Sequence, residues 1–130
     1  MKKFLEGFTF VLVVTLAANC SANSYDDSPY YVFVTTVQGT IYLDLRTVNV
    51  HDYNPPYYQI AGYFVWVNGD KERRYEVVIN YNWDKKETYH RGDGYWIKDR
   101  IEPENVYSRS NRKMADALFR AAYGMDFYGY

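Results

Sequence analysis

The sequence is poor in several residue types, and each shortage excludes a class of protein. Its 130 residues include one cysteine, Cys20, so no disulfide can form within a single chain. The two histidines, His51 and His90, have no second histidine or cysteine at a metal-ligand spacing, which argues against a zinc site. The formal net charge is -1, and no basic cluster offers a surface to nucleic acid or anionic lipid. We therefore expect stability to come from packing alone, with no metal and no cofactor.

Catalytic motifs are also missing from the sequence. Neither histidine has a serine or cysteine in a recognisable local setting for nucleophilic catalysis. None of the eight glycines opens a helix directly after a strand, as a phosphate-binding loop requires. We expect both histidines to be surface or turn residues, and we predict that the protein is not an enzyme.

Long hydrophobic runs are limited to residues 8–18, near the N-terminus. Lys2 and Lys3 precede this run, and small and polar residues follow it as far as Ala22, which is the layout of a secretory signal. The run has about half of the roughly 20 residues that a helix needs to cross a bilayer. We therefore interpret residues 1–22 as a signal peptide and expect an exported protein, located in the periplasm, at the cell surface or in the medium.

Two routes of processing are open. A lipoprotein peptidase would cut before Cys20 and leave a lipid anchor there, but it normally requires Gly, Ala or Ser where this chain has Asn19. An ordinary signal peptidase would cut after Ala22 and remove the cysteine, and the small side chain of Ala22 favours this second route. We expect contact with a membrane only if Cys20 is lipidated.

The mature chain predicts a short polar tether at residues 23–29 and a single domain at residues 30–130. Alternating, aromatic or β-branched segments predict strands at residues 30–37, 40–45, 57–67, 73–83, 87–90 and 95–98. Residues 47–50 extend the sheet briefly, and residues 51–56 are expected to loop because prolines cannot donate backbone hydrogen bonds. Asn68 and Gly69 predict a type I′ turn.

The hydrophobic period changes to that of a helix from Ser110 onward. The apolar stripe consists of Met114, Leu118, Ala121 and Ala122. The residues expected to lie away from that stripe are Arg112, Lys113, Asp116 and Arg120. Gly124 can end the helix, and residues 125–130 are too apolar for a free tail. The predicted fold class is α+β, a meander of about six antiparallel strands with one C-terminal helix packed on the sheet.

Tyrosine is unusually abundant, with 16 residues. Tyrosine offers a large contact area at low cost in side-chain entropy, which suits recognition surfaces, and it also suits strands. Tyr75 and Tyr81 lie on the apolar face of their strand, where we expect core packing. Three tyrosines that follow the proline-rich segment are candidates for an aromatic contact surface, namely Tyr57, Tyr58 and Tyr63. For Tyr57 and Tyr63, core packing is the alternative.

Arg91, Gly92 and Asp93 form the tripeptide that integrins recognise. The strand pattern places this tripeptide at the tip of a hairpin, so it is a candidate recognition loop. The same residues also have the backbone preferences of a tight turn, and a plain turn is the alternative interpretation.

The run from Ile41 to Val48, with Asp44 followed by Thr47 and Val48, resembles the surface-adhesin protein E family, small exported bacterial proteins. The resemblance covers residues 30–125 in outline and implies an antiparallel sheet, a C-terminal helix and binding of host matrix and serum proteins. Members of that family often join the strand region to the helix by a disulfide, but this chain has Asn82 and Trp83 near the corresponding position. No binding residue of the family matches a position here.

Two functions follow from these observations as hypotheses. The first is a non-catalytic, exported cell-envelope or surface binding protein, adhesin-like, that recognises a host or envelope protein. The second is a periplasmic protein that binds a small ligand or assists envelope assembly, with aromatic side chains lining a cleft between sheet and helix. A homodimer is compatible with both.

Overall fold

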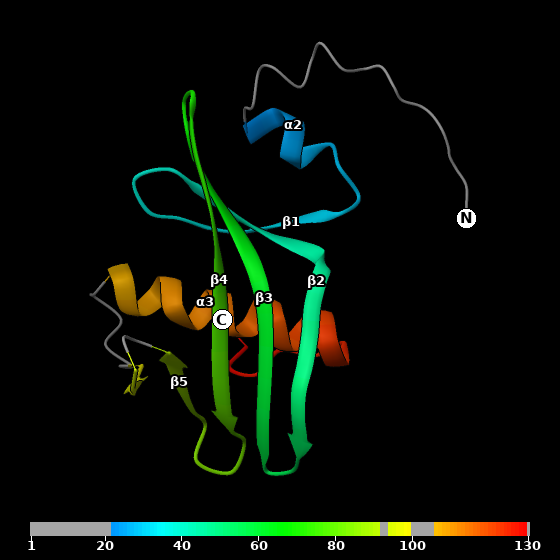
Figure 1. Ribbon diagram of the computed structural model, residues 1–130, viewed down its shortest axis with the longest axis vertical. Coiled ribbons are helices and arrows are strands. Elements are labelled where there is room, and N and C mark those ends of the chain that lie inside the picture. The colour runs from blue at the N-terminus through cyan, green and yellow to red at the C-terminus, as the bar shows by residue number, and fades with distance from the viewer. Residues whose placement is uncertain (1–21, 92–93, 100–105, 130) are drawn as a thin grey trace.

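The computed structural model describes residues 22–91, 94–99 and 106–129. Figure 1 shows the order of the elements along the chain. They are α2 (Ala22–Asp26), β1 (Tyr31–Thr36), β2 (Thr40–Asn54), β3 (Tyr57–Asn68), β4 (Lys71–Asn82), β5 (Glu87–Arg91), β6 (Trp96–Lys98) and α3 (Val106–Tyr123). Among these residues, no helix is long and apolar enough to cross a membrane.

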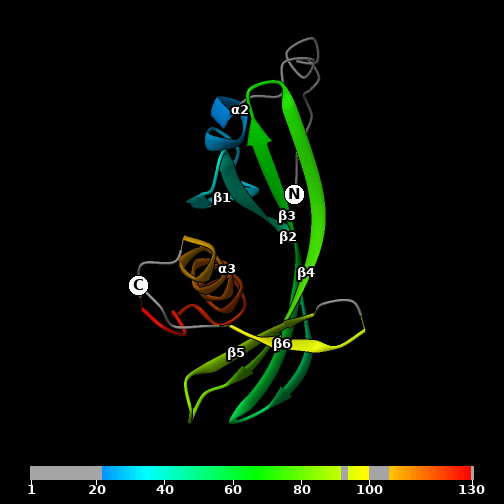
Figure 2. The ribbon, with the colours of Figure 1, turned by 90° about the vertical axis from the view of Figure 1, so that its left-hand side faces the viewer.

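The six strands form one antiparallel sheet in the order β1-β2-β3-β4-β5-β6, and each strand pairs with the next along the chain. Helix α3 packs on one face of this sheet, as Figure 2 shows. The predicted α+β meander with a C-terminal helix is therefore confirmed. It forms because the turn-forming residues interrupt alternating segments at short intervals, which makes sequential pairing the shortest way to bury their apolar faces.

The long hairpin of β3 and β4 turns one residue later than predicted. Asn68 pairs with Lys71, so the turn residues are Gly69 and Asp70 instead of Asn68 and Gly69. Gly69 has a φ of 65°, which glycine adopts without steric cost, and no positive φ is recorded at Asn68 or Asp70. A glycine at the first central position is typical of a type II′ turn, so the predicted type I′ turn is wrong.

Strand β2 is longer than the sequence predicts, because residues 51–54 belong to it. Asp52, Tyr53 and Asn54 pair with residues of β3, and the chain reverses at Pro55 and Pro56 alone. The predicted loop at residues 51–56 is wrong since both prolines lie beyond the last pair and remove no hydrogen bond from the ladder. The longer strand carries two shifts in register, the larger between Asp44 and Asn49.

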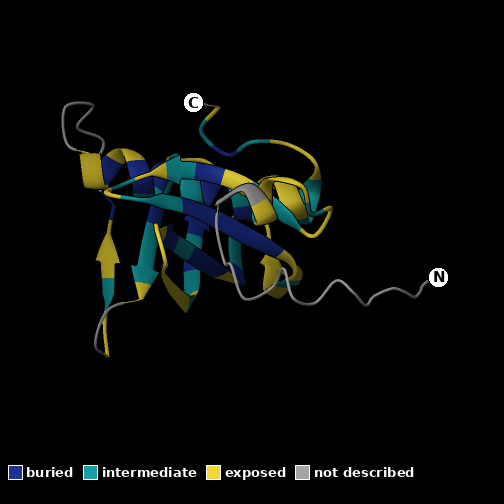
Figure 3. Cartoon of the chain, turned by 90° about the horizontal axis from the view of Figure 1, so that it is seen from above, coloured by how far each residue is buried: buried dark blue, intermediate teal, exposed yellow. Residues whose placement is uncertain are grey.

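The main hydrophobic core lies between α3 and the sheet. Its fully buried members include Leu43, Ile60, Phe64, Ile79, Tyr81, Leu118 and Phe119. Figure 3 shows these buried segments where the central strands lie close to the helix. Tyr81 is buried as predicted, and its hydroxyl donates a hydrogen bond of 2.7 Å to the carbonyl oxygen of Ala115. Ala121 of the predicted helical stripe is exposed.

Helix α3 begins at Val106, before the predicted Ser110, and two of its polar residues are buried although the sequence predicts them outside. Arg112 and Asp116 are both almost fully buried. The C-terminal residues return along the helix, and the Asp116 carboxylate accepts hydrogen bonds from the backbone N–H groups of Phe127, Tyr128 and Gly129. Burial of Phe127 confirms that the C-terminal segment lies against the domain.

Residues 23–29, predicted as a tether, contain most of α2 and pack against the sheet. The Tyr25 ring stacks on Tyr42 at 5.2 Å, and the Tyr42 hydroxyl donates a hydrogen bond of 3.0 Å to Asp26. Burial, and then the Asp26 carboxylate, raise the pKa of Tyr42 to about 12. Tyr42 belongs to a second, smaller cluster with Val65 and Val67, and Tyr25 covers that cluster. Residues 23–29 are mostly polar, and Tyr25 is their one aromatic residue, so the sequence of this segment does not reveal the contact.

Candidate functional site

A concave region lies between the first half of α3 and the sheet. It has a volume of about 490 Å³. We call it the Trp66 groove, and its lining residues are Val37, Ile41, Trp66, Arg73, Tyr75, Tyr107, Ser110, Asn111 and Met114. Pockets that bind small molecules span roughly 300 to 1,000 Å³ and combine apolar walls with a few polar groups. The Trp66 groove meets both conditions.

Pairing of β3 with β4 fixes the aromatic wall of the groove. Trp66 pairs with Arg73, and Phe64 pairs with Tyr75, so that these side chains share the face covered by α3. The indole Nε1 of Trp66 donates a hydrogen bond of 3.2 Å to the carbonyl oxygen of Val37. Gly39 permits this close approach, because a Cβ atom there would lie 2.6 Å from Nε1. The plane of the indole ring is therefore set by the β1–β2 turn.

Polar residues are also among those that line the groove. The hydroxyl of Ser110 is buried and has no hydrogen-bond partner within the described part of the chain. Burial raises the pKa of the Tyr75 hydroxyl, and the Arg73 guanidinium opposes that effect. The Arg73 guanidinium lies 6.0 Å from the centre of the Trp66 ring. A buried hydroxyl without a partner costs about 1 to 3 kcal/mol, which a ligand that accepts its hydrogen bond would recover.

A second cavity, of about 390 Å³, adjoins the Trp66 groove and shares Tyr75, Asn111 and Met114 with it. We call it the His90 cavity, because the imidazole of His90 and the carboxylate of Asp99 line it. The Nδ1 atom of His90 lies 2.6 Å from Oδ1 of Asp99. Such a contact orients an imidazole and leaves its Nε2 atom to interact with a ligand.

The sequence does not predict the pairing of His90 with Asp99. Asp99 follows the short strand β6, and its backbone N–H donates to the carbonyl oxygen of Thr88 in β5. The Thr88 hydroxyl donates a hydrogen bond of 2.8 Å to Oδ2 of Asp99. The hydroxyl and the imidazole thus bond to opposite oxygens of one carboxylate. In a catalytic pair of nucleophile and base, by contrast, the hydroxyl is hydrogen-bonded to the imidazole itself.

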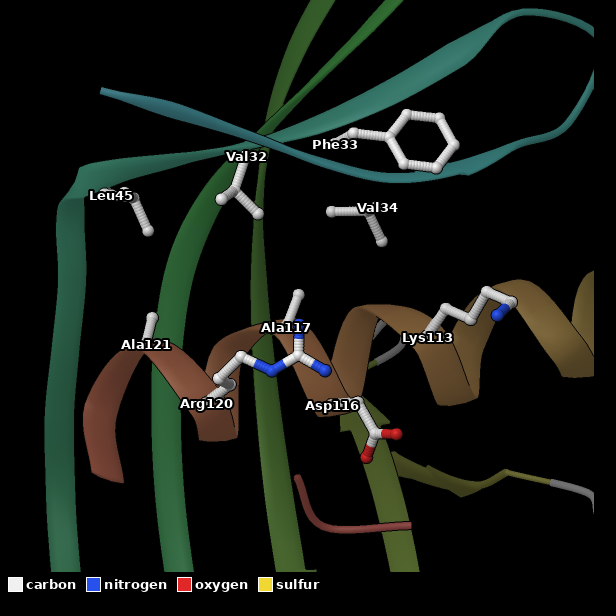
Figure 4. Close-up of a pocket in the computed structure, with 9 residues that line it drawn as sticks. All are labelled: Val32, Phe33, Val34, Leu45, Lys113, Asp116, Ala117, Arg120 and Ala121. Carbon is white, nitrogen blue, oxygen red and sulfur yellow. The ribbon is translucent and has the colours of Figure 1, made fainter. Parts of the chain in front are cut away.

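A third hollow lies between β1 and α3 and has a volume of about 160 Å³ (Figure 4). Its walls include Val32, Val34, Lys113 and Arg120. This volume is about half of the smallest ligand pockets, and Arg120 is engaged with Asp126 at 2.7 Å. We interpret it as a gap in packing.

The structure separates the three tyrosines predicted to form an aromatic contact surface. Tyr57 and Tyr63 are 54% and 38% exposed and, six residues apart in β3, share the face away from the main core. Tyr58 is on the core face, where its ring lies 5.3 Å from that of Phe119 and 5.4 Å from that of Tyr123. Tyr58 therefore packs against α3, and only Tyr57 and Tyr63 are accessible together.

The other predicted site residues are Cys20 and the tripeptide of residues 91–93, and of these only Arg91 is among the described residues. Cys20, Gly92 and Asp93 lie outside them. Arg91 ends β5, is exposed and places its guanidinium 5.4 Å from the centre of the Trp96 ring. The recognition loop and the lipidation of Cys20 therefore stay predictions.

The segment that carries the family resemblance has a structural task. Asp44 is 1% exposed and accepts hydrogen bonds from Arg46 and Arg74. Burial alone would raise the pKa of the Asp44 carboxyl, but these hydrogen bonds outweigh burial and lower the pKa to about 2. The Thr47 hydroxyl donates to the carbonyl oxygen of Asp44 and accepts from the backbone N–H of Tyr63. These bonds span the larger register shift of β2, so Asp44 and Thr47 hold the bend of this strand.

Comparisons with known proteins add nothing to this geometry. No family model, no curated protein and no solved structure matches the chain. Across residues 22–91, 94–99 and 106–129, no group of three or more His, Cys, Asp or Glu side chains is placed to hold a metal ion. The features of the fold that bear on function are therefore the Trp66 groove and the His90 cavity.

Proposed function

We propose that this protein is a non-catalytic binding protein and that the Trp66 groove binds a small apolar ligand. The observation that carries the proposal is a groove of about 490 Å³ whose lining residues include Ser110, a serine with a buried hydroxyl that has no partner among the described residues. Trp66, Tyr75 and Met114 supply the apolar contact. Methionine adapts its shape to different ligands, and aromatic rings provide a large contact area with little loss of entropy.

The ligand would be met outside the cytoplasm. This part of the proposal is supported by the charged, apolar and small-residue pattern of residues 1–22. Cleavage before Cys20 or after Ala22 would leave Tyr25 and Asp26 in the mature chain, where they contact Tyr42. The intact mass of the mature protein from cells tests this, because an N-terminus at neither Cys20 nor Asn23 would contradict it.

A blocking variant tests the groove directly. Asn111 lines both the Trp66 groove and the His90 cavity and is partly exposed on α3, so Asn111→Trp fills the site without disturbing the core. Met125→Trp is the matched control, since Met125 is exposed and does not line the groove. Binding of octanol, octanoate and indole is measured by isothermal titration calorimetry.

We expect at least one of these compounds to bind the unmodified protein and Met125→Trp equally, and to lose its affinity for Asn111→Trp. Thermal unfolding of each variant verifies that it is folded. Equal binding by Asn111→Trp, or no binding of any of the three compounds to the unmodified protein, would contradict the proposal.

Adhesion to a protein partner is the second candidate function, and the exposure of Tyr57 and Tyr63 on the face away from the main core favours it. Its test is binding to a panel of immobilised host matrix proteins. Tyr57→Ser together with Tyr63→Ser should abolish the binding, and Asp93→Glu separately tests the recognition loop. No binding to any member of the panel would exclude this candidate.

A further inference from the structure

We propose that the ligand of the Trp66 groove is a small apolar monocarboxylate whose carboxylate lies beside Arg73. This inference rests on the proposed function and adds the chemical class of the ligand. It is carried by three features of the groove, which are its charge, its hydrogen-bond donors and its apolar walls.

The described lining residues of the groove carry charge of one sign. Arg73 is the one charged residue among them, and they include no Asp or Glu. No ion pair of Arg73 is formed within the described part of the chain. Arg74, the next residue, is different because its guanidinium is held by Asp44. Arg73 is therefore available to a negatively charged group at the edge of the groove.

The hydrogen-bond donors of the groove match an acceptor-rich ligand end. Ser110 has a buried hydroxyl with no partner among the described residues. Tyr75 has a hydroxyl whose pKa is raised by burial, an effect that Arg73 opposes. A hydroxyl and a guanidinium both donate to carboxylate oxygens. A single guanidinium balances one negative charge, whereas a doubly charged phosphate group calls for more cations.

The rest of the groove favours an apolar body. Val37, Ile41, Trp66 and Met114 form walls with no charge, and the indole N–H of Trp66 is already used by the carbonyl oxygen of Val37. A ligand polar along its whole length would lose hydrogen bonds to water against these walls. A short apolar chain or ring with a terminal carboxylate satisfies both the walls and the donors.

Three probes of equal chain length separate the contributions. Octanoate, octanol and octylammonium are titrated into the full chain by isothermal titration calorimetry at neutral pH and low salt. Since charge-assisted hydrogen bonds are about twice as strong as neutral ones, we expect octanoate to bind roughly fivefold to tenfold more tightly than octanol. Octylammonium should bind most weakly. Octanoate affinity should fall as salt is added, whereas octanol affinity should not.

Arg73→Gln should reduce the affinity for octanoate to that for octanol and leave octanol unaffected. Lys85→Gln removes the same charge from an exposed turn outside the groove and is the matched control. Equal affinities for octanoate and octanol, or full octanoate affinity in Arg73→Gln, would overturn the assignment of a carboxylate while leaving apolar binding in place. Failure of these three probes and of indole to bind would overturn the proposed function as well.

Discussion

Replacing Asp44 with asparagine tests whether this buried carboxylate holds the bend of β2. Its partners come from two strands, since Arg46 follows it in β2 and Arg74 belongs to β4. Arg46 also donates to the Tyr31 hydroxyl of β1 at 2.9 Å. Asp44→Asn keeps the shape of the side chain but removes the charge that brings the two guanidinium groups together.

The size of the effect follows from the pKa. Burial raises the pKa of the Asp44 carboxyl, but the hydrogen bonds from Arg46 and Arg74 outweigh burial and lower it from 3.8 to about 2. At about 1.4 kcal/mol per pKa unit, this difference contributes about 2 kcal/mol to the free energy of unfolding. The figure is an upper value, because both arginines are partly exposed and solvent screens their charges.

The sign of the pH dependence is also fixed. Because the pKa of Asp44 is lower in the folded state, its contribution is complete above the unfolded pKa of about 4 and is lost as the pH falls through about 2. Urea unfolding at pH 7 should show Asp44→Asn to be less stable than the unmodified protein by at most about 2 kcal/mol. The difference between the two proteins should shrink between pH 4 and pH 2.

Asp70→Asn is the control, because Asp70 is exposed at the tip of the β3–β4 hairpin. A loss below about 0.5 kcal/mol in Asp44→Asn, equal to that of the control, would refute the reasoning. A constant difference between pH 7 and pH 2 would show that lost packing, and not the lost charge, weakens the variant.

Three further variants test other parts of the structure. Tyr81→Ala should lower the free energy of urea unfolding by about 3 to 5 kcal/mol, and a loss below about 1 kcal/mol would contradict its burial. Ser110→Ala should unfold no more easily, because a buried hydroxyl without a partner is removed, yet bind octanoate more weakly; lower stability would contradict this. Asp116→Ala should speed hydrogen exchange at the Phe127 amide, and unchanged protection would argue that Asp116 does not hold the C-terminal segment.

The sheet could be predicted from the sequence because alternation is a local signal. Tyr75, Ile79 and Tyr81 alternate with polar residues along β4, and a single face of the sheet buries them. The end of β2 could not be predicted in the same way. Pro55 and Pro56 suggest an irregular segment around them, but their effect is confined to the two turn residues.

The wrong predictions of which α3 residues are buried have a different physical origin. The helical period predicts Arg112 and Asp116 outside because they lie away from the apolar stripe of α3, but both are buried. Asp116 is buried because the C-terminal segment covers it and supplies three backbone N–H donors. Nothing in the pattern of α3 itself indicates that residues 127–129 return to this position.

The candidate site could be predicted only in part. Alternation along β4 identifies Tyr75 as inward, but a sequence does not show where helix and sheet leave space between them. The pairing of His90 with Asp99 depends on the register of β5 and β6, which brings Asp99 opposite Thr88. Residue separation alone does not reveal that contact.

The most direct test of the central claim is an NMR titration of the ¹⁵N-labelled protein with octanoate. Two of the three tryptophans are internal controls. Trp66 lines the groove, whereas Trp83 stacks on Phe119 in the core and Trp96 lies beneath Arg91. We predict a saturable shift of the Trp66 indole N–H and the Asn111 backbone amide, with Trp83 and Trp96 unchanged. Saturable shifts confined to residues outside the groove, or no shift at Trp66, would contradict the claim.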